Sequence, residues 1–477
     1  MQRSAEVDNI RRSKSSTPKL LPALAFITLL PGVYSQASQS IHSMGVTFKT
    51  IWRALHNGND YFASNHYEEA RQYPPVEQLY YIPYRLRSPV NGIRLYRFYD
   101  SDGVQHTESS QGHLPGSKKE SILGVAWPQV SAPGGTEEMY QLRDLNQLSA
   151  IAVPKAPAAG FEEKVPLTGL YAYPRYGYQE KTLECISGSS IKLCSDKAAG
   201  GSIAELVWNN YNFIKDDGYS HNIQSSILGD HAKPTEGGST FNKDESEKVA
   251  WNGAPLISLI SNNNRQSSSA IPIDRTSRRP RLARGVTGVI YPDLKIGKNL
   301  QIDAEEFKQN EALSLYASQI IVYDAQVTMP TDWSGTKLVI LEVPGGSIPT
   351  KSKWPSHFYT VDALYSDPTK SVREIFNSDF QYEGESDDYK YLFQAGGGIA
   401  IATGREEHAI AVYSRRSQQG KEGEFYGHLH KKGVHGHWSL RYAGPLYAGQ
   451  NTFRAYIILG EIEEVHKIMH LLYTEGY

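Results

Sequence analysis

Four histidines stand close together near the C-terminus, in a pattern that could hold a metal ion. His428 and His430 are followed, after a four-residue interval, by His435 and His437. If residues 431–434 form a hairpin turn, His430 lies opposite His435 and His428 lies opposite His437. Side chains two apart on a strand share a face, so three of these imidazoles could bind zinc or copper. Two lysines in the turn and the lack of a nearby carboxylate favour a solvated hairpin instead, and we expect no cofactor.

A second pair of residues has the side chains needed for proton transfer. Glu236 lies in the glycine-rich segment 234–238, and His408 stands two residues before the apolar run that begins at Ile410. A carboxylate and an imidazole that meet in one cleft can act as general acid and base. Each residue also has a structural interpretation, as a surface charge for Glu236 and as a hydrogen-bonded residue at a strand start for His408.

Three further side chains suit a ligand that is rich in hydroxyl groups. The Gln224 amide both donates and accepts hydrogen bonds. The Trp438 ring could stack on a sugar, and the Arg441 guanidinium could bind an acidic group. Trp438 could equally belong to the core.

Cys185 and Cys194 are the only two cysteines, and they flank a short, turn-rich segment. In a secreted chain they could form a disulfide that closes this local loop. Free buried thiols are the alternative.

The elements that must position all these residues are β-strands. Period-two alternation of apolar residues appears at 202–208, 337–343, 398–402 and 454–459. Helical periodicity is clear only over Glu461–Tyr473 and weak over Ala304–Phe307. Residues 261–285 look like a long, exposed, arginine-rich loop. For residues 179–477, the pattern therefore predicts a large sandwich of antiparallel strands.

A different pattern, repeated three times, occupies residues 38–178. The aromatic residues Trp52, Tyr96 and Tyr140 are each 44 residues apart. A second aromatic element recurs at Tyr81–Tyr84, Val125–Pro128 and Tyr171–Pro174. A fixed period of this size indicates one supersecondary unit copied three times. We expect a β module whose exposed rings serve as platforms for sugar faces.

The length, the charge and the N-terminus limit the possible functions. A chain of 477 residues argues for two or three domains, and a net charge of −2 gives no electrostatic reason to bind nucleic acid. Residues 1–37 resemble a secretory signal, with basic residues, then the uncharged stretch Leu20–Tyr34, then small residues at Ser35 and Ala37. An uncleaved anchor is the alternative. After cleavage the protein would be extracellular or periplasmic, with no membrane contact.

The C-terminal region resembles a group of secreted bacterial and fungal proteins with a galactose-mutarotase-like supersandwich. The resemblance rests on the stretches Gly200–Asn209, Lys233–Gly238, Glu407–Ser414, Trp438–Arg441 and Phe453–Gly460. It implies a concave sheet that receives a sugar, with Glu236 on a loop above that sheet. The group's segment that matches the region of Gln224 also ends in a glutamine.

The three repeats are similar to a lectin-like repeat family of unknown function. The family pattern is aromatic-Arg-Leu-Tyr followed by a turn like Asp-His-Phe. Residues Asn59–Phe62 and Gln105–Thr107 keep part of that turn, whereas the third copy lacks it.

We therefore expect a mostly β protein with a signal peptide (residues 1–37), a threefold β-repeat, lectin-like domain (38–178) and a large antiparallel β-supersandwich (179–477). The expected function is binding of an extracellular or cell-wall polysaccharide, with hydrolase, lyase or epimerase chemistry as an open possibility. A non-catalytic adhesin or carbohydrate-binding surface protein is the alternative, and a metal-binding protein is a third. Convergence of Glu236 and His408 in one cleft would favour an enzyme. The sequence does not indicate the oligomeric state.

Overall fold

The computed structural model describes residues 45–477 with interruptions. The interruptions are residues 57–59, 75–76, 84–91, 101–105, 135, 145–149, 155–160, 175–182, 215–221, 229–232, 238, 242–249, 275–287, 334–339, 350–356, 362–371, 375–388, 392–398, 403–407, 416–423 and 431–434. The predicted signal peptide lies outside the described residues, and residues 38–477 form one compact unit. Within the described residues, no helix combines the length and the apolar character needed to cross a membrane.

Residues 45–174, here called the repeat region, fold as three successive units of three strands. The strands are β1 (Val46–His56), β2 (Asp60–Ser64), β3 (Glu77–Pro83), β4 (Ile93–Asp100), β5 (His106–Ser109), β6 (Ser117–Pro128), β7 (Glu137–Asp144), β8 (Ala150–Pro154) and β9 (Phe161–Pro174). Two short helices, α2 (Tyr67–Ala70) and η1 (Gln129–Ser131), lie between them. In each unit the first strand pairs antiparallel with both the second and the third. The three units thus share one connectivity.

Most aromatic rings of the repeat are buried, which corrects the expectation of exposed rings. The buried rings, each at most 9% exposed, are those of Trp52, Tyr81, Tyr96, Trp127 and Tyr173. Tyr140 is half-buried. Large rings contribute most when they are removed from water, because they bury a large apolar area. The repeated aromatic residues are therefore mostly core residues.

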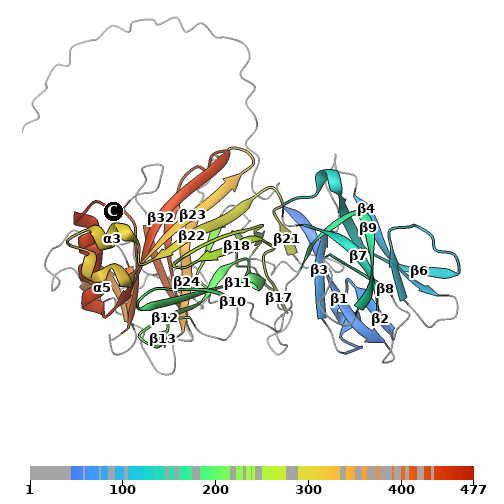
Figure 1. The fold of residues 1–477 in the computed structure, drawn as a ribbon, viewed down its shortest axis with the longest axis horizontal. Coiled ribbons are helices and arrows are strands. Elements are labelled where there is room, and N and C mark those ends of the chain that lie inside the picture. The colour runs from blue at the N-terminus through green and yellow to red at the C-terminus, as the bar shows by residue number, and fades with distance from the viewer. Residues whose placement is uncertain are drawn as a thin grey trace, which may run out of the picture. The chain divides into compact units, whose positions relative to one another are not determined.

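Residues 183–477, here called the sandwich region, contain two large antiparallel sheets (Figure 1). Sheet one runs in the order β21 (Gly288–Ile290), β20 (Ile273–Asp274), β15 (Pro234–Thr235), β14 (Gln224–Leu228), β24 (Ile340–Pro349), β31 (His435–Ala443), β30 (Glu424–His430) and β27 (Tyr389–Tyr391). Sheet two runs in the order β18 (Leu256–Asn262), β19 (Arg265–Ala270), β22 (Lys295–Ile302), β23 (Ile320–Met329), β32 (Gly449–Gly460), β29 (Ala409–Tyr413), β28 (Ile399–Ala402), β25 (His357–Val361) and β26 (Val372–Glu374). The mostly β, sandwich-like fold class is confirmed.

Two smaller groups of strands complete the region. Sheet three contains β10 (Leu183–Ser187), β11 (Ile191–Asp196), β12 (Ser202–Trp208) and β13 (Tyr211–Asn212), and a separate hairpin contains β16 (Ser239–Phe241) and β17 (Ala250–Asn252). The helices are η2 (Lys197–Ala199), α3 (Glu305–Gln309), η4 (Ser314–Gln319) and α5 (Ile462–Thr474).

One hydrophobic core joins the inner faces of the two large sheets. Sheet one contributes Ile227, Leu341 and Trp438, and sheet two contributes Leu300 and Ile457, among others. A second core lies on the outer face of sheet two, where α3, η4 and α5 cover one half of that face (Figure 1). The other half of that outer face is not covered by these helices.

The alternating patterns predict the strands well. Residues 202–208 form β12, residues 399–402 form β28, and residues 454–459 lie inside β32. The predicted C-terminal helix is α5, shifted by one residue at each end. The loop predicted for 261–285 is wrong in its first part, because residues 265–270 form β19. The run of asparagines is the tight turn of the β18–β19 hairpin, where Asn263 takes a positive φ of 49°.

Candidate functional site

A row of polar side chains crosses the outer face of sheet one on β14, β24 and β31. In the ladder, Ser226 pairs with Glu342, and Glu342 pairs with Arg441. Gln224 and Ser439 stand two residues from Ser226 and Arg441 on their own strands, so all five share one face. Leu341 and Val343 on either side of Glu342, and Leu440 between Ser439 and Arg441, belong to the core, so β24 and β31 alternate between apolar and polar faces here.

Glu342 is the centre of this polar row. Its Oε2 accepts a hydrogen bond from Ser226 Oγ at 3.0 Å. Its Oε1 accepts from Ser439 Oγ at 3.2 Å and from Arg441 Nε and Nη2 at 3.1 and 2.7 Å. Glu342 is 2% exposed, whereas the Arg441 side chain keeps 18% of its surface in solvent. The carboxylate therefore orients a guanidinium that is accessible at its outer edge.

Gln224, at one end of the row, is held by β15 and the residues that follow it. Thr235 Oγ1 donates to Gln224 Oε1 at 3.0 Å. Gly237 packs so closely that a Cβ there would lie 1.7 Å from the same oxygen. These contacts leave the amide oxygen of Gln224 occupied and set the direction of its NH2 group.

Trp438 lies on the opposite face from Arg441. It is 2% exposed and belongs to the core between the sheets, so the structure places it in the core position that was the alternative for this residue. Positions 438 and 441 are an odd number of residues apart, and in a regular strand such positions face opposite sides. The structure therefore separates these two predicted ligand contacts.

Glu236 is enclosed between the two large sheets. Its side chain is 0% exposed, and Oε1 accepts hydrogen bonds from Lys298 Nζ and from the Ser225 backbone N–H, both at 2.9 Å. The Glu236 backbone N–H in turn donates to the Ser225 carbonyl at 3.1 Å. Glu236 Oε2 is buried and has no hydrogen-bond partner among the described residues. The carboxylate thus binds the backbone of β14 from the core side, at Ser225 between Gln224 and Ser226.

Lys298 and Tyr323 complete the buried cluster around Glu236. Lys298 Nζ also donates to the Gly201 carbonyl at 2.7 Å, and the Tyr323 hydroxyl lies 2.8 Å from Ser225 Oγ. Burial lowers the pKa of Lys298, and the adjacent carboxylate opposes that shift. Burial, reinforced by the charge of Glu236, raises the pKa of Tyr323 well above its usual value. The cluster is a charged pair removed from water.

His408 lies elsewhere, against sheet three. Its ring stacks on Tyr211 at 4.5 Å and meets Trp208 edge-on at 5.8 Å. Ala409, which follows His408, pairs with Gly460 of β32, and Tyr323, whose hydroxyl lies near Glu236, pairs with Ala455 of the same strand. These two positions are five residues apart along β32. At about 3.3 Å per residue this is about 17 Å. No contact joins Glu236 to His408 among the residues that the structure describes.

The histidine-rich hairpin has the predicted backbone register. β30 ends at His430, β31 begins at His435, and His428 pairs with His437. The four imidazoles and the turn residues 431–434 lie outside what the structure describes, so the metal hypothesis stays a prediction.

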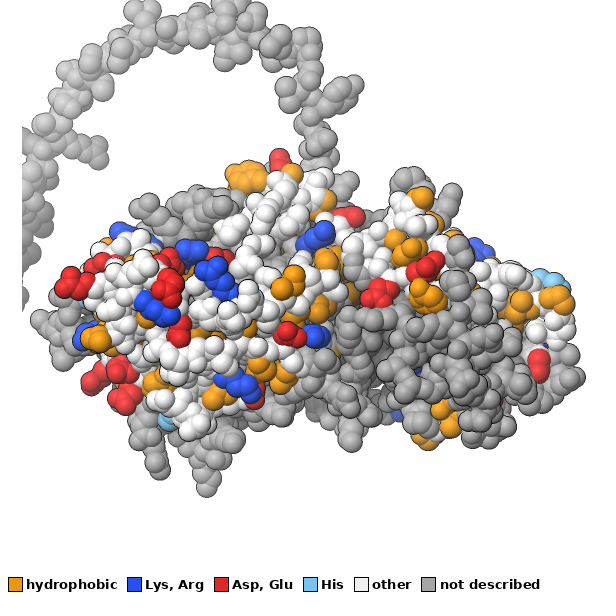
Figure 2. Space-filling view, in the orientation of Figure 1, with side chains coloured by type: hydrophobic (Ala, Val, Ile, Leu, Met, Phe, Trp, Pro, Cys, Tyr) orange, Lys and Arg blue, Asp and Glu red, His pale blue; other side chains and the backbone are white. Residues whose placement is uncertain are grey.

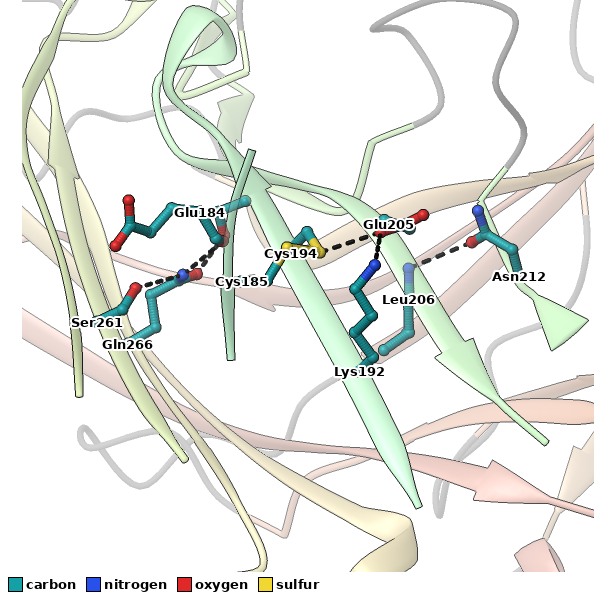
Figure 3. Close-up of a disulfide and its surroundings, with 10 residues drawn as sticks. Glu184, Cys185, Lys192, Cys194, Glu205, Leu206, Asn212, Ser261 and Gln266 are labelled. Carbon is teal, nitrogen blue, oxygen red and sulfur yellow. Dashed lines mark hydrogen bonds and ion pairs between the residues drawn. A yellow bond between two sulfur atoms is a disulfide. The ribbon is translucent and has the colours of Figure 1, made fainter. Parts of the chain in front are cut away.

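The two cysteines form a disulfide across the β10–β11 hairpin (Figure 3). Cys185 pairs directly with Cys194 in the ladder, and Glu205 and Lys192 form an ion pair of 2.8 Å beside the bridge. Together with Glu205, these cysteines are the one group of three potential metal ligands within the described ranges. Both sulfur atoms are bonded to each other, so this group suits a structural role.

Sequence reasoning missed Glu342 and Lys298, although each leaves a signal. Glu342 stands alone between apolar residues in a β-strand pattern. Lys298 occurs where Ile296, Leu300 and Ile302 predict an apolar, inward-facing position. A charge on the apolar side of an alternating strand indicates a buried partner.

The sequence matches no protein-family model, and no curated protein matches it. Several solved structures are similar to this chain at low identity. A putative aldose 1-epimerase from Escherichia coli K12 shares 9% identity over 59% of this chain and 100% of its own, with a TM-score of 0.33. A galactose mutarotase related enzyme from Lactobacillus acidophilus shares 12% over 58% of this chain and 97% of its own, with a TM-score of 0.34.

A 4-alpha-glucanotransferase from Thermococcus litoralis is also similar. It shares 6% identity over 60% of this chain and 38% of its own length, with a TM-score of 0.30. Values this low assign neither an activity nor a substrate to the present chain.

Proposed function

We propose that this protein is a secreted, glycan-binding protein whose sugar site is the outer face of sheet one. The observation that carries the proposal is the row formed by Gln224, Ser226, Glu342, Ser439 and Arg441. Four of these side chains are each at most 5% exposed, and Arg441, with 18% of its side chain in solvent, is the most exposed of the five. Its guanidinium is a donor of the kind that sugar hydroxyls accept, and the buried members of the row hold it in place. The same function is implied by the resemblance of the sequence to secreted mutarotase-like proteins.

The separation of Glu236 from His408 favours binding without catalysis by this pair. General acid–base chemistry needs both groups within reach of one substrate bond. Glu236 instead pairs with Lys298 in the core, and His408 stacks on Tyr211. We therefore place the adhesin or binding-protein reading first. Hydrolase, lyase or epimerase chemistry by other residues is the second candidate.

A glycan array with residues 38–477 tests the proposal, with soluble products followed by mass spectrometry. We expect wild type to retain a set of polysaccharides without releasing products, and Gln224→Ala and Arg441→Lys to lose at least tenfold in affinity. Lys192→Gln, an exposed change on sheet three, serves as the matched control. Equal binding by all four proteins would contradict the proposed site, and product release would support the enzyme.

A further inference from the structure

A hollow of about 510 Å3 lies on the outer face of sheet two, next to α3. It is floored by β18, β19, β22, β23 and β32. Asn299 and Gln301 project into it from β22, since the residues between and beside them, Lys298 and Leu300, face the core. The volume falls in the range of small-ligand sites, about 300–1,000 Å3.

The hollow exists because the helices cover only part of the sheet. Val322 and Tyr456 lie beneath them and are buried in the second core. Two residues away, Asp324 and Arg454 are on the same outer face, but their side chains are 19% and 47% exposed. The strands of sheet two therefore continue past the helical cover and leave a polar floor in solvent.

The side chains of this floor suit an uncharged ligand that is rich in hydroxyl groups. Arg454 Nε and Nη2 each donate to one oxygen of Asp324 at 2.7 Å, which presents a rigid pair of donor and acceptor groups. Amides from Asn299 and Gln301 stand on the neighbouring strand. Ile260, 64% exposed at the rim, offers an apolar surface to the C–H face of a sugar ring.

The charge balance of the hollow excludes a strongly charged partner. Two arginines (Arg265 and Arg454) stand against three carboxylates (Glu305, Glu306 and Asp324), a net charge of −1. Figure 2 shows acidic and basic side chains interspersed over the helical end of the sandwich region, with no large area of one sign. A polyanion or a polycation gains little from such a surface, whereas a neutral glycan is complementary to it.

We propose that this hollow is a second glycan site that binds a neutral oligosaccharide. The ligand class rests on the proposed function, because both sites would take sugar. The location does not depend on it, since the two sites occupy outer faces of different sheets. The protein would then hold two segments of polysaccharide at once, which raises its apparent affinity for long chains over short ones.

The experiment uses residues 38–477 with maltohexaose, cellohexaose and mannohexaose as neutral probes and a heparin hexasaccharide as the anionic control. Calorimetry compares wild type with Asn299→Ala/Gln301→Ala, with Gln224→Ala and with the control Lys192→Gln. We expect at least one neutral probe to bind at two sites, and the double variant to weaken one of them at least tenfold. Hydrogen exchange with the bound probe should slow in β22 and β32.

The outcomes separate the two proposals. Loss of binding in the double variant alone supports the second site and contradicts the sheet-one site. Loss in Gln224→Ala alone, with no slowing of exchange in β22, overturns the second site. Tighter binding of the heparin hexasaccharide than of every neutral probe, with slowed exchange in β22 and β32, or no binding of any probe, also overturns it.

Discussion

At the scale of single residues, the buried pair of Glu236 and Lys298 decides how β14 is held. Both side chains are 0% exposed. Two charges removed from water are costly, and only their mutual contact and added hydrogen bonds compensate. Because Glu236 also accepts from the Ser225 N–H, this pair ties β22 to the strand that carries Gln224 and Ser226. We regard Glu236 as a positioning residue for the polar row.

Glu236→Gln should therefore destabilise the protein by about 3–5 kcal/mol, because Lys298 is left buried without its counter-charge. Urea denaturation followed by tryptophan fluorescence measures the change. The double variant Glu236→Gln/Lys298→Met should recover part of the loss, since it removes both charges. If the double variant is less stable than the single one, the pair does not act through charge compensation.

A second prediction at this scale concerns pH and Glu69 in the repeat region. Burial raises the pKa of Glu69, but the hydrogen bonds from Arg97 and Ser64 and the charge of Arg97 together lower it by more, so its pKa lies below the usual value of 4.5. Arg97 Nη2 and Nη1 donate to the two carboxylate oxygens at 2.7 and 3.1 Å. The unfolded chain then takes up a proton before the folded one as the pH falls. The stabilisation by Glu69 is present above about pH 4.5 and is lost below it.

Glu69→Gln should accordingly be less stable than wild type at pH 7 and should lose less of its unfolding free energy between pH 5 and pH 3. Chemical denaturation at several pH values measures both slopes. Glu311→Gln, an exposed change outside the repeat region, should follow the wild-type slope. Parallel curves for Glu69→Gln and wild type would show that this carboxylate does not contribute to acid unfolding.

At the scale of elements, α5 packs on the outer face of sheet two and covers the second core. Its buried residues recur at three- and four-residue intervals, which turns one helix face toward the sheet. Ile468 is 0% exposed in this core. Ile468→Ala should cost about 2–5 kcal/mol of unfolding free energy, from lost burial and the cavity left behind. Thermal and urea unfolding measure it, and the exposed neighbour Lys467→Ala should change little.

The strands and helices are the part of the structure that the sequence predicts best. Strands such as β12 and the helix α5 each show one apolar face, which sequence periodicity reports directly. The direction of the Glu236 side chain depends instead on Lys298, a residue 62 positions away, and no local pattern encodes that contact. The polar row likewise joins three strands that are distant in sequence, so its centre, Glu342, was missed.

At the scale of the whole molecule, the repeat and sandwich regions share a seam. Strand β1 pairs antiparallel with β21, and Val46 lies opposite Ile290. A hydrophobic cluster combines Phe48 and Tyr81 of the repeat region with Ile273 and others of the sandwich region. The repeated aromatic rings that suggested a sugar platform thus help to bury the junction.

The seam predicts that both regions respond to one change within it. Ile290 is 0% exposed in the seam cluster, so Ile290→Ala should cost about 2–5 kcal/mol and should speed hydrogen exchange in β1 and β3 as well as in β20. Ile468→Ala is the matched control, because it makes the same change at an equally buried residue of the second core. In that variant, exchange in β1 and β3 should stay at the wild-type rate. Faster exchange confined to β20 and β21 in Ile290→Ala would show that the repeat region is stable without the seam, because its strands would then open independently of the sandwich.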